Sequence, residues 1–413
     1  MAPPKVLIIG AGISGLTLAQ LLRKQDVPFE IFERDMSHTS RGVGYAIGLY
    51  NLEETFGDLL PDDLPPFQTT CHLLPLALPS QFRLYFPDGN AVGIQDTPET
   101  PCIRVNRLKL RKLLSTNINI QWGKYAKDII QTADSVTVRF EDGTSATGDV
   151  LIGADGTYSS VRPCILDKPN SEVLRRYPIA TIVGEVKLDA KDTETQLRLA
   201  HSFYIAVGPE TKFQMSSALN KLRVDETSGK VEGGDYYWII SQFTDEVVTD
   251  EQHWARVEGP EDKLKRAKEM VKGLKMEELR VVVERTGVDG IKSGVWSAWW
   301  DAEIEEVPAV NRVVLIGDAA HPMTPIQGNG AIHAIQDAVA VSKVLTKIDT
   351  ADMTAARSAL DELQKEVIRR GLESIRVGRA IAAGGLTQDR KLFAWGHELN
   401  VVDNIEELPV KLT

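Results

Sequence analysis

Residues 5–33 read KVLIIGAGISGLTLAQLLRKQDVPFEIFE, and this stretch decides the fold class. Lys5 to Gly10 is a short apolar run with β-branched residues, which is typical of a buried parallel strand. Ile13 to Lys24 carries apolar residues at helical spacing, and Phe29 to Glu33 is a second strand-like run. The stretch therefore predicts a βαβ unit with a right-handed crossover, which opens a doubly wound α/β sheet.

Three glycines at the first strand-to-helix junction predict a dinucleotide site. Gly10, Gly12 and Gly15 spell GxGxxG, in which the first glycine makes the turn and the second lets the backbone approach a pyrophosphate. The third glycine allows the helix to pack closely on the strand. Glu33 ends the second strand, where its carboxylate is placed to accept hydrogen bonds from a ribose diol. A tight turn that binds nothing is the alternative.

The composition excludes several classes of protein. The 413 residues include 47 Lys and Arg against 58 Asp and Glu, a net charge of −11, so a nucleic-acid partner is not expected. The three cysteines, Cys71, Cys102 and Cys164, are too few and too far apart for a disulfide framework or a metal site. No run is long and apolar enough for a membrane span, and the first strand begins at Val6 without room for a signal peptide. We therefore expect a soluble cytoplasmic protein without a metal.

The middle of the chain reads mostly as β-structure. Residues 58–80 are rich in proline and predict a loop or a domain crossing. Turn signals at Asp88-Gly89 and Asp142-Gly143 each predict a β-hairpin, and Arg107 to Leu114 predicts a short amphipathic helix. From Pro178 to Phe243 several strand-like runs follow one another without intervening helices, which indicates a mostly antiparallel second sheet.

The last third of the chain returns to α/β character. Residues 261–285 alternate charges at helical spacing, which is typical of a solvated helix face. Arg312 to Gly317 predicts another buried strand, followed by a loop and a helix from Ala331 to about Lys347. We expect the remainder of the chain to be helical. No second GxGxxG occurs, which disfavours enzymes with two dinucleotide-binding domains.

Two later segments indicate which dinucleotide cofactor the site binds. Residues 153–162 read GADGTYSSVR, and residues 317–337 read GDAAHPMTPIQGNGAIHAIQD. With GxGxxG before them, these segments closely resemble the class A flavin-dependent (FAD) monooxygenases, the family of the p-hydroxybenzoate hydroxylase-like aromatic hydroxylases and the tetracycline-inactivating monooxygenases. The resemblance covers about residues 5–345. It implies a Rossmann-like FAD-binding domain with an inserted, mostly antiparallel β-sheet substrate domain and a helical C-terminal region.

We expect the domains to follow this pattern along the chain. Residues 1–172 would form the first part of the FAD-binding domain, with a possible excursion into the substrate domain at 71–99. The substrate domain would span 173–284, the second part of the FAD-binding domain 285–347, and the C-terminal helices 348–413.

The resemblance also implies which residues contact FAD. The first motif and its acid would bind the ADP half, the DG segment would lie beside the cofactor, and the GD aspartate would hold the ribityl chain. The expected contacts are Gly10, Gly12, Ile13, Ser14, Gly15, Glu33, Arg34, Arg41, Gly42, Gly44, Arg107, Asp155, Gly317, Asp318, Pro325, Gly328, Asn329, Gly330 and Ala331.

Among these expected FAD contacts, the helix start near Gly330 has independent physical support, and Asn329 differs from the usual residue of the family. Pro322 and Pro325 turn the chain after Asp318, and a helix then begins near Gly330, so its first amides suit a flavin pyrimidine oxygen. Asn329 stands where the family usually has glutamine, which puts the side-chain contact there in doubt.

The substrate pocket should lie where the second sheet faces the flavin. Strand alternation puts Tyr236 and Trp238 on one face, opposite Tyr237, and separates Gln214 from Met215. Our pocket candidates, and hence our candidates for catalytic residues, are Arg198, His201, Gln214, Tyr236 and Trp238. A plain aromatic core is the competing interpretation.

The resemblance implies an enzyme that uses NADH or NADPH and O2. A flavin C4a-hydroperoxide would hydroxylate or epoxidise an electron-rich small molecule such as a phenol, an indole or a polyketide-like ring. The nearest alternative is a reductase or oxidase of the same fold that does not insert oxygen. A flavin-binding partner protein and a plain NAD-dependent dehydrogenase are the others. The sequence does not predict the oligomeric state.

Overall fold

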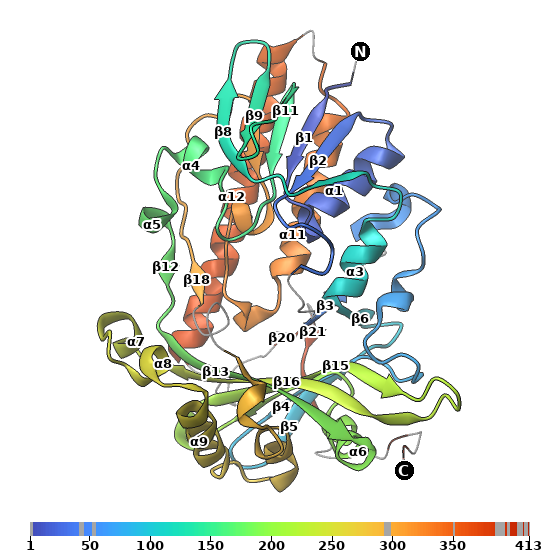
Figure 1. The fold of residues 1–413 in the computed structure, drawn as a ribbon, viewed down its shortest axis with the longest axis vertical. Helices are drawn as coiled ribbons and strands as arrows, with labels where there is room; N and C mark the ends of the chain where they lie inside the picture. Colours follow the sequence, from blue (N-terminus) through green and yellow to red (C-terminus); the bar gives the residue numbers. More distant parts are fainter. Residues whose placement is uncertain are drawn as a thin grey trace.

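The computed structural model describes residues 3–40, 45–51, 55–292, 299–349, 352–384, 393–394, 397–402, 408 and 412. Figure 1 shows a Rossmann-like layer, which carries the N-terminus, above a large curved sheet. The two layers have separate apolar cores. A ribbon of two strands lies between them in the view of Figure 1 and comes from β3 (Ala46–Tyr50) and β6 (Cys102–Asn106).

The Rossmann-like layer is a five-stranded parallel sheet in the order β19-β11-β1-β2-β7. Its strands are β1 (Val6–Ile9), β2 (Phe29–Glu33), β7 (Ile120–Trp122), β11 (Val150–Gly153) and β19 (Val313–Leu315). Every residue of β1 is buried, which explains its wholly apolar sequence, because side chains on both faces of a covered parallel sheet leave water.

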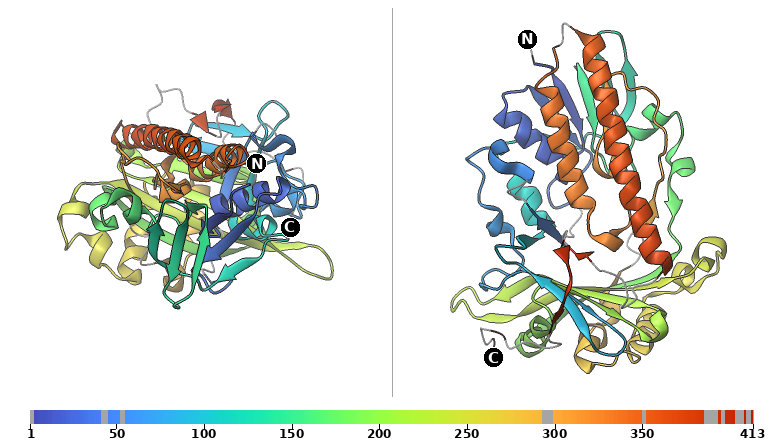
Figure 2. Two further views of the ribbon diagram at one scale, coloured as in Figure 1. Left: turned by 90° about the horizontal axis from the view of Figure 1, so that it is seen from above. Right: turned by 180° about the vertical axis from the view of Figure 1, so that it is seen from behind.

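Three helices pack in this layer. Helix α1 (Ile13–Lys24) lies against α11 (Gly330–Leu345), and the long α12 (Met353–Gly384) runs beside α11 (Figure 2). A small antiparallel sheet of β8 (Ala126–Gln131), β9 (Val136–Phe140) and β10 (Ser145–Gly148) joins the same core, where the Phe140 ring lies 4.7 Å from that of Phe32. The expected FAD-binding segments are therefore held by one continuous core.

The second layer is an eight-stranded sheet in the order β17-β13-β16-β15-β14-β4-β5-β22. Its pairs are antiparallel except that β14 and β4 run parallel. Its strands are β4 (Gln81–Tyr85), β5 (Ala91–Gln95), β13 (Ile179–Asp189), β14 (Phe203–Val207), β15 (Gln214–Val224), β16 (Val231–Phe243), β17 (Ile291–Lys292) and β22 (Asn400–Val402).

Helices cover the face of this sheet that points away from the Rossmann-like layer (Figure 1). They are α6 (Ala190–Leu199), α9 (Pro260–Val271) and α10 (Val281–Glu284), and their apolar residues share one core with the sheet. The opposite face of the sheet is turned toward the Rossmann-like layer. A substrate that meets a cofactor of that layer must therefore lie on this second face.

Several expectations from the sequence are confirmed. The first βαβ unit, the hairpins β4-β5 and β9-β10, and the short helix α3 (Arg107–Leu114) are all present. The expected run of strands from 178 to 243 was wrong in one respect, because α6 interrupts it. Asp189 caps this helix by accepting a hydrogen bond from the Asp192 amide at 2.8 Å, and apolar neighbours on both sides hid that signal.

Within the described residues, the C-terminal helix α12 extends to Gly384. Beyond it lie three short strands, β20 (Phe393–Ala394), β21 (His397–Glu398) and β22, and β22 adds to the edge of the large sheet beside β5. A strand of three residues is stabilised by its pairing partner rather than by its own pattern, so the sequence did not reveal it.

The remaining elements connect the two layers. Short strands β12 (Arg175–Arg176) and β18 (Trp300–Asp301) pair with each other. The short helices are α4 (Arg162–Leu166), α5 (Asn170–Val173), α7 (Glu246–Thr249) and α8 (Trp254–Val257). The 3-10 turns are η1 (Gly57–Leu59), η2 (Phe67–Thr70), η3 (Pro209–Thr211), η4 (Glu277–Arg280), η5 (Val288–Gly290), η7 (Gly317–Ala319) and η8 (Pro325–Gln327).

Among the described residues, no helix combines the length and the apolar run that crossing a bilayer requires.

Candidate functional site

The three glycines of the first motif have different surroundings. Gly10 has a positive φ of 107°, and a Cβ atom there would lie 2.4 Å from the Ala154 carbonyl oxygen. A Cβ atom at Gly15 would lie 2.0 Å from the Gly10 carbonyl oxygen, so both positions exclude side chains by packing. At Gly12 no atom of the described residues lies within 4 Å of such a Cβ atom. The backbone is therefore open only at Gly12, where a pyrophosphate would approach.

Helix α1 begins at this open position without a side-chain cap and without an acidic residue in its first turn. Its first amides, including those of Ile13 and Ser14, can therefore serve an anion. Ser14 also lies against the GD segment, since a Cβ atom at Gly317 would lie 2.9 Å from the Ser14 hydroxyl oxygen. The first and third cofactor segments thus meet directly.

Glu33 is 5 % exposed, and both of its carboxylate oxygens are bonded. Oε2 accepts from the Ala11 amide at 2.8 Å, and Oε1 accepts from the Asp35 amide at 3.0 Å. Arg111 lies 3.3 Å from Oε2 and donates to the Ala11 carbonyl at 2.8 Å. The sequence did not single out Arg111, although it stands one helical turn after Arg107 on α3. Arg34 follows Glu33 and is half-buried.

Asp155 of the DG segment holds its own loop. One carboxylate oxygen, Oδ2, accepts from the Ser160 amide at 2.7 Å and from the Ser160 hydroxyl at 3.0 Å. The other, Oδ1, is buried and has no hydrogen-bond partner in the structure. Because a buried carboxylate oxygen without a partner is costly, Oδ1 is an acceptor that a ligand or a water could satisfy.

Arg162 joins the DG and GD segments, and the sequence did not identify it as a site residue. Its guanidinium is fully buried and donates to the carbonyls of Thr157 at 2.9 Å, Asp318 at 2.8 Å and Ala319 at 2.8 Å. Desolvation lowers the pKa of Arg162 to about 10, which leaves it charged at neutral pH. Arg162 therefore fixes the backbone from which Asp318 projects.

Asp318 has the properties expected of a cofactor ligand. Its side chain is exposed, yet surrounding protein desolvates it and raises its pKa, against the opposing effects of His321, Arg107 and Arg162. Its carboxylate accepts a hydrogen bond from the Thr157 hydroxyl at 3.3 Å. Arg107 is thus within electrostatic range of Asp318, although the two residues come from separate parts of the chain.

The loop after the GD segment prepares the start of α11. Pro325 opens the turn η8, Gly328 follows with a positive φ of 67°, and α11 starts at Gly330 without a side-chain cap. The side-chain oxygen of Asn329 accepts from the Tyr50 hydroxyl at 3.4 Å. Ala331 is half-buried in the first turn. The hydrogen bond between Tyr50 and Asn329 brings strand β3 to the place where a flavin pyrimidine ring would meet the helix.

These features fit FAD. An open glycine and an uncapped α1 suit the pyrophosphate, Asp318 suits a ribityl hydroxyl, and the uncapped α11 suits the pyrimidine oxygen. The other predicted contacts, Arg41, Gly42 and Gly44, lie outside the described residues.

The large sheet presents a polar aromatic cluster toward this site. The rings of Tyr45 and Tyr237 stack with their centroids 4.1 Å apart, and the Tyr45 hydroxyl donates to Glu185 at 3.2 Å. Arg104 of β6 donates to the Tyr237 hydroxyl at 2.7 Å. Desolvation, followed by the charge of Glu185, raises the pKa of Tyr45 far above its usual value, so this phenol stays protonated.

Two of the five pocket candidates lie in the core instead. Trp238 is fully buried and donates its indole N–H to the Thr286 hydroxyl at 2.8 Å, and Tyr236 is 4 % exposed in the same cluster. Both face α9 and α10, away from the Rossmann-like layer. The alternation was predicted correctly, but Tyr237 occupies the side that faces the cofactor segments. We therefore withdraw Tyr236 and Trp238 as pocket residues.

The other three candidates are scattered. Arg198 lies on α6 and pairs with Glu194 at 2.7 Å, on the far side of the sheet. His201 is 5 % exposed, and its Nδ1 lies 3.0 Å from the Pro79 carbonyl oxygen. Both placements indicate structural roles, so we withdraw them as well. Gln214 is half-buried and shares a face with Tyr237.

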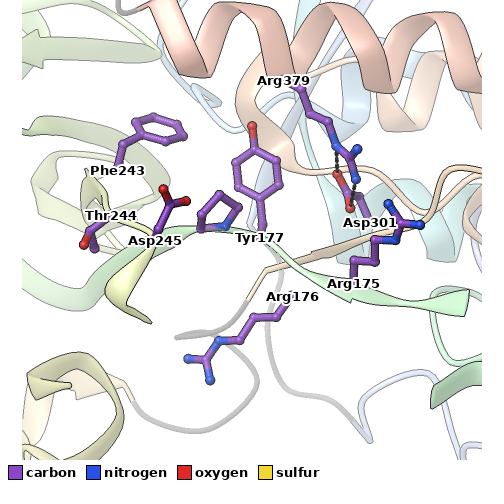
Figure 3. A pocket seen from close by; sticks show the side chains of 9 residues that line it. Arg175, Arg176, Tyr177, Phe243, Thr244, Asp245, Asp301 and Arg379 are labelled. Atoms are coloured by element: carbon purple, nitrogen blue, oxygen red, sulfur yellow. Dashed lines mark hydrogen bonds and ion pairs between the residues drawn. The ribbon is translucent and has the colours of Figure 1, made fainter. Parts of the chain in front are cut away.

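A separate cavity of about 530 Å³ lies where β12, the end of β16 and α12 meet (Figure 3). Arg379 and Asp301 close one side of it with paired hydrogen bonds of 2.7 and 2.8 Å. Its lining residues are Arg175, Arg176, Tyr177, Pro178, Phe243, Thr244, Asp245, Asp301 and Arg379. None of them is a predicted FAD contact, so this cavity is distinct from the cofactor segments.

Known protein families match two segments of the chain, and known proteins match nearly its whole length. Residues 8–39 match a family described as an NAD(P)-binding Rossmann-like domain, and residues 292–372 match a family described as an FAD binding domain. The FAD-dependent monooxygenase thnD of Trichoderma harzianum is 39% identical over 392 residues, which cover 94% of this chain and 95% of thnD. The chain belongs to the FAD-dependent monooxygenases. A second member of the family, cctM of Talaromyces islandicus, is 26% identical over 90% of each chain.

Solved structures share the fold of this FAD-dependent monooxygenase. Klebsiella pneumoniae HpxO, complexed with FAD and uric acid, superposes with a TM-score of 0.68 at 22% identity and covers 91% of this chain and 87% of its own. The 2,6-dihydroxypyridine-3-hydroxylase of Arthrobacter nicotinovorans gives 0.69 at 19% identity, over 99% and 100%. The sequence prediction of a class A flavin monooxygenase with FAD as cofactor is confirmed.

Proposed function

We propose that this FAD-dependent monooxygenase uses NADH or NADPH and O2 to hydroxylate or epoxidise an electron-rich aromatic, indole-like or polyketide-like small molecule. The observation that carries this proposal is the half-buried ring of Tyr45, which stacks on the buried Tyr237 on the sheet face that points toward the predicted FAD segments. The hydroxyls of the two rings are hydrogen-bonded to Glu185 and Arg104. Flat aromatic faces bordered by a few polar groups are the usual means of orienting a planar ligand.

When bound, FAD supplies the chemistry, because it takes hydride from the reduced nicotinamide and activates O2 for transfer of one oxygen atom to the substrate. The protein supplies position and exclusion of water. Asp318 and the helix starts of α1 and α11 would hold the cofactor, and Arg162 would keep Asp318 in place. The DG segment, with the open acceptor of Asp155, would line its other side.

Substrate orientation would come from the sheet. Glu185 is half-buried, is bonded to Tyr45, and pairs with Lys292 at 2.7 Å, so its carboxylate can accept a hydrogen bond from a substrate hydroxyl. Gln214, also half-buried on this face, can donate to a carbonyl. These groups suit a ring that carries hydroxyl and carbonyl substituents. Two relatives support this class by analogy, since uric acid and dihydroxypyridine are both electron-rich rings.

The test is a substrate screen with purified holoenzyme. Phenols, naphthols, indoles and aromatic polyketides would be added to enzyme with NADH or NADPH in air, while nicotinamide oxidation and product mass are followed together. A substrate that accelerates nicotinamide oxidation and gains one oxygen atom supports the proposal. Acceleration with a product that gains two hydrogens would favour a reductase of the same fold, and a product that loses two hydrogens without consumption of nicotinamide would favour an oxidase.

Two further expectations from the sequence, the division into domains and the cytoplasmic location, remain proposals. The division into an FAD-binding domain, an inserted substrate domain and a C-terminal region is supported by the two separate cores, with β4 and β5 of the 71–99 excursion in the large sheet. A cytoplasmic location rests on the sequence, and a fluorescent fusion would test it.

A further inference from the structure

A buried carboxylate on α11 lies directly under the GD turn. Asp337 is fully buried, and its Oδ2 accepts from the Gly317 amide at 2.8 Å and lies 2.7 Å from Nε2 of His321. Its other oxygen, Oδ1, accepts from Arg370 of α12 at 2.5 Å. One side chain therefore connects the turn that presents Asp318 to the C-terminal helix.

The turn itself depends on such support. Gly317 has a positive φ of 57°, and its Cα packs so closely on Ser14 that a side chain would collide with it. Arg162 holds the carbonyls of Asp318 and Ala319 from the other side. Among the described residues, Asp337 alone accepts a hydrogen bond from the Gly317 amide. Asp337 and Arg162 thus fix the turn at its amide and its carbonyls.

Helix α12 also packs directly against the turn. A Cβ atom at Gly371 would lie 2.3 Å from Cβ of His321, so α12 packs against the imidazole through a glycine. Arg370, the preceding residue, bonds both Asp337 and Glu366. A buried carboxylate is stable only when it is paired and hydrogen-bonded, and Arg370 supplies the permanent positive charge for this one.

The charges of the cluster are consistent with this. Desolvation raises the pKa of Asp337, but His321 and then Arg370 outweigh it, so the net pKa is lowered. Desolvation lowers the pKa of His321, but Asp337 outweighs it through its charge and its hydrogen bond, so the net pKa is raised. The neighbouring His333 has a pKa of about 4 because it is desolvated, and it is neutral at physiological pH.

We propose that Asp337 is a positioning residue for FAD and that Arg370 makes helix α12 part of the cofactor site. Loss of the arginine would leave the carboxylate with His321 as its only side-chain partner and would loosen the Gly317 amide. The Asp318 carboxylate would then be displaced from the position in which it meets the ribityl chain. This proposal rests on FAD as the cofactor, but not on the choice of substrate.

The experiment compares Arg370→Gln with Arg369→Gln, a matched control. Arg369 is the adjacent residue of the same helix, is exposed, and makes only a loose surface pair with Glu373 at 3.7 Å. Apoprotein of each variant would be titrated with FAD, and the thermal unfolding of each apoprotein would be measured. We expect Arg370→Gln to weaken FAD binding by about tenfold or more, since a charge-assisted hydrogen bond is lost, and Arg369→Gln to bind as the wild type.

Arg370→Lys separates positioning from general stability. It keeps the charge and should recover most of the FAD affinity, even where its apoprotein unfolds at the same temperature as that of Arg370→Gln. Equal FAD affinity in Arg370→Gln and Arg369→Gln would overturn the proposal, and so would a loss of affinity that Lys does not restore. Failure of the wild-type apoprotein to bind FAD would instead contradict the cofactor assignment.

Discussion

The guanidinium of Arg162 donates a hydrogen bond to the carbonyl oxygen of Asp318 at 2.8 Å, across 156 residues of sequence. The DG and GD segments are therefore one structural unit, although five of the eight described strands of the large sheet, β13 to β17, lie between them in the chain. The buried side chain of Arg162 thus holds the two segments together, although the inserted strands separate them in the sequence.

Replacement of Arg162 by glutamine should destabilise the fold as well as the cofactor site. Arg162 serves three backbone carbonyls, and each buried acceptor left without a partner costs about 1–3 kcal/mol. Urea unfolding of the apoprotein measures the loss. Arg198→Gln is the control, because Arg198 makes an ion pair within α6, and such a pair contributes about 0.5 kcal/mol. Equal unfolding midpoints for the two variants would refute the role assigned to Arg162.

Gly12 and Gly15 should respond differently to the same substitution. Gly12→Val should fold, because no atom of the described residues lies within 4 Å of its Cβ position. It should purify without flavin, because the side chain takes the space of the pyrophosphate. Gly15→Val should fail to fold stably, since its Cβ would lie 2.0 Å from a backbone oxygen. Flavin absorbance and circular dichroism of both proteins distinguish the outcomes. A yellow Gly12→Val protein would show that this turn is only structural.

Tyr237 and Tyr236 form a second matched pair. Tyr237→Phe removes the partner of Arg104 on the face toward the FAD segments, and we expect it to lower the fraction of consumed nicotinamide that yields product. Tyr236→Phe removes a buried hydroxyl that has no hydrogen-bond partner among the described residues, so it should be neutral or stabilising and leave this fraction unchanged. Peroxide and product are measured per nicotinamide consumed. The reverse pattern would place the substrate on the other face of the sheet.

The His321–Asp337 pair should make stability depend on pH. The folded-state pKa of His321 is raised above 6.5, so its contribution is complete below pH 6.5 and is lost as pH rises through the raised value. The pKa of Asp337 is lowered below 3.8, so its contribution is present above pH 3.8 and is lost only as pH falls through the lowered value. The stability difference between wild type and His321→Gln should therefore shrink as pH rises from 6 to about 9, as measured by urea unfolding.

His333, Asp318 and Arg370 also face this pair, but all three are present in both proteins. His333 has a pKa of about 4 and does not titrate in that range. A difference that grows with pH would show that His321 is neutral in the folded protein.

The cofactor segments could be predicted from the sequence because their geometry is local. Gly10, Gly12 and Gly15 meet their structural requirements within one turn, and the GD loop is shaped by its own prolines and glycines. Arg111 and Arg162 could not be predicted in the same way, because their partners are backbone oxygens of distant segments. An arginine in a helix pattern gives no sign of the carbonyls that fold against it.

The substrate face was the weakest prediction for a related reason. Alternation along β16 separates Tyr236 from Tyr237, but the pattern is equally apolar on both sides, since both faces of this sheet are covered. The packing of α9 and α10 on one face, and of Tyr45 on the other, decides which tyrosine points toward the segments predicted to bind FAD. That information lies in the tertiary structure.

Turnover under ¹⁸O2 with a substrate found in the screen shows whether this enzyme inserts oxygen into its substrate. We expect a product that carries one ¹⁸O atom, formed only in the presence of FAD and reduced nicotinamide. A product without the label, or a labelled product formed equally well by the flavin-free Gly12→Val protein, would contradict flavin-dependent oxygen insertion.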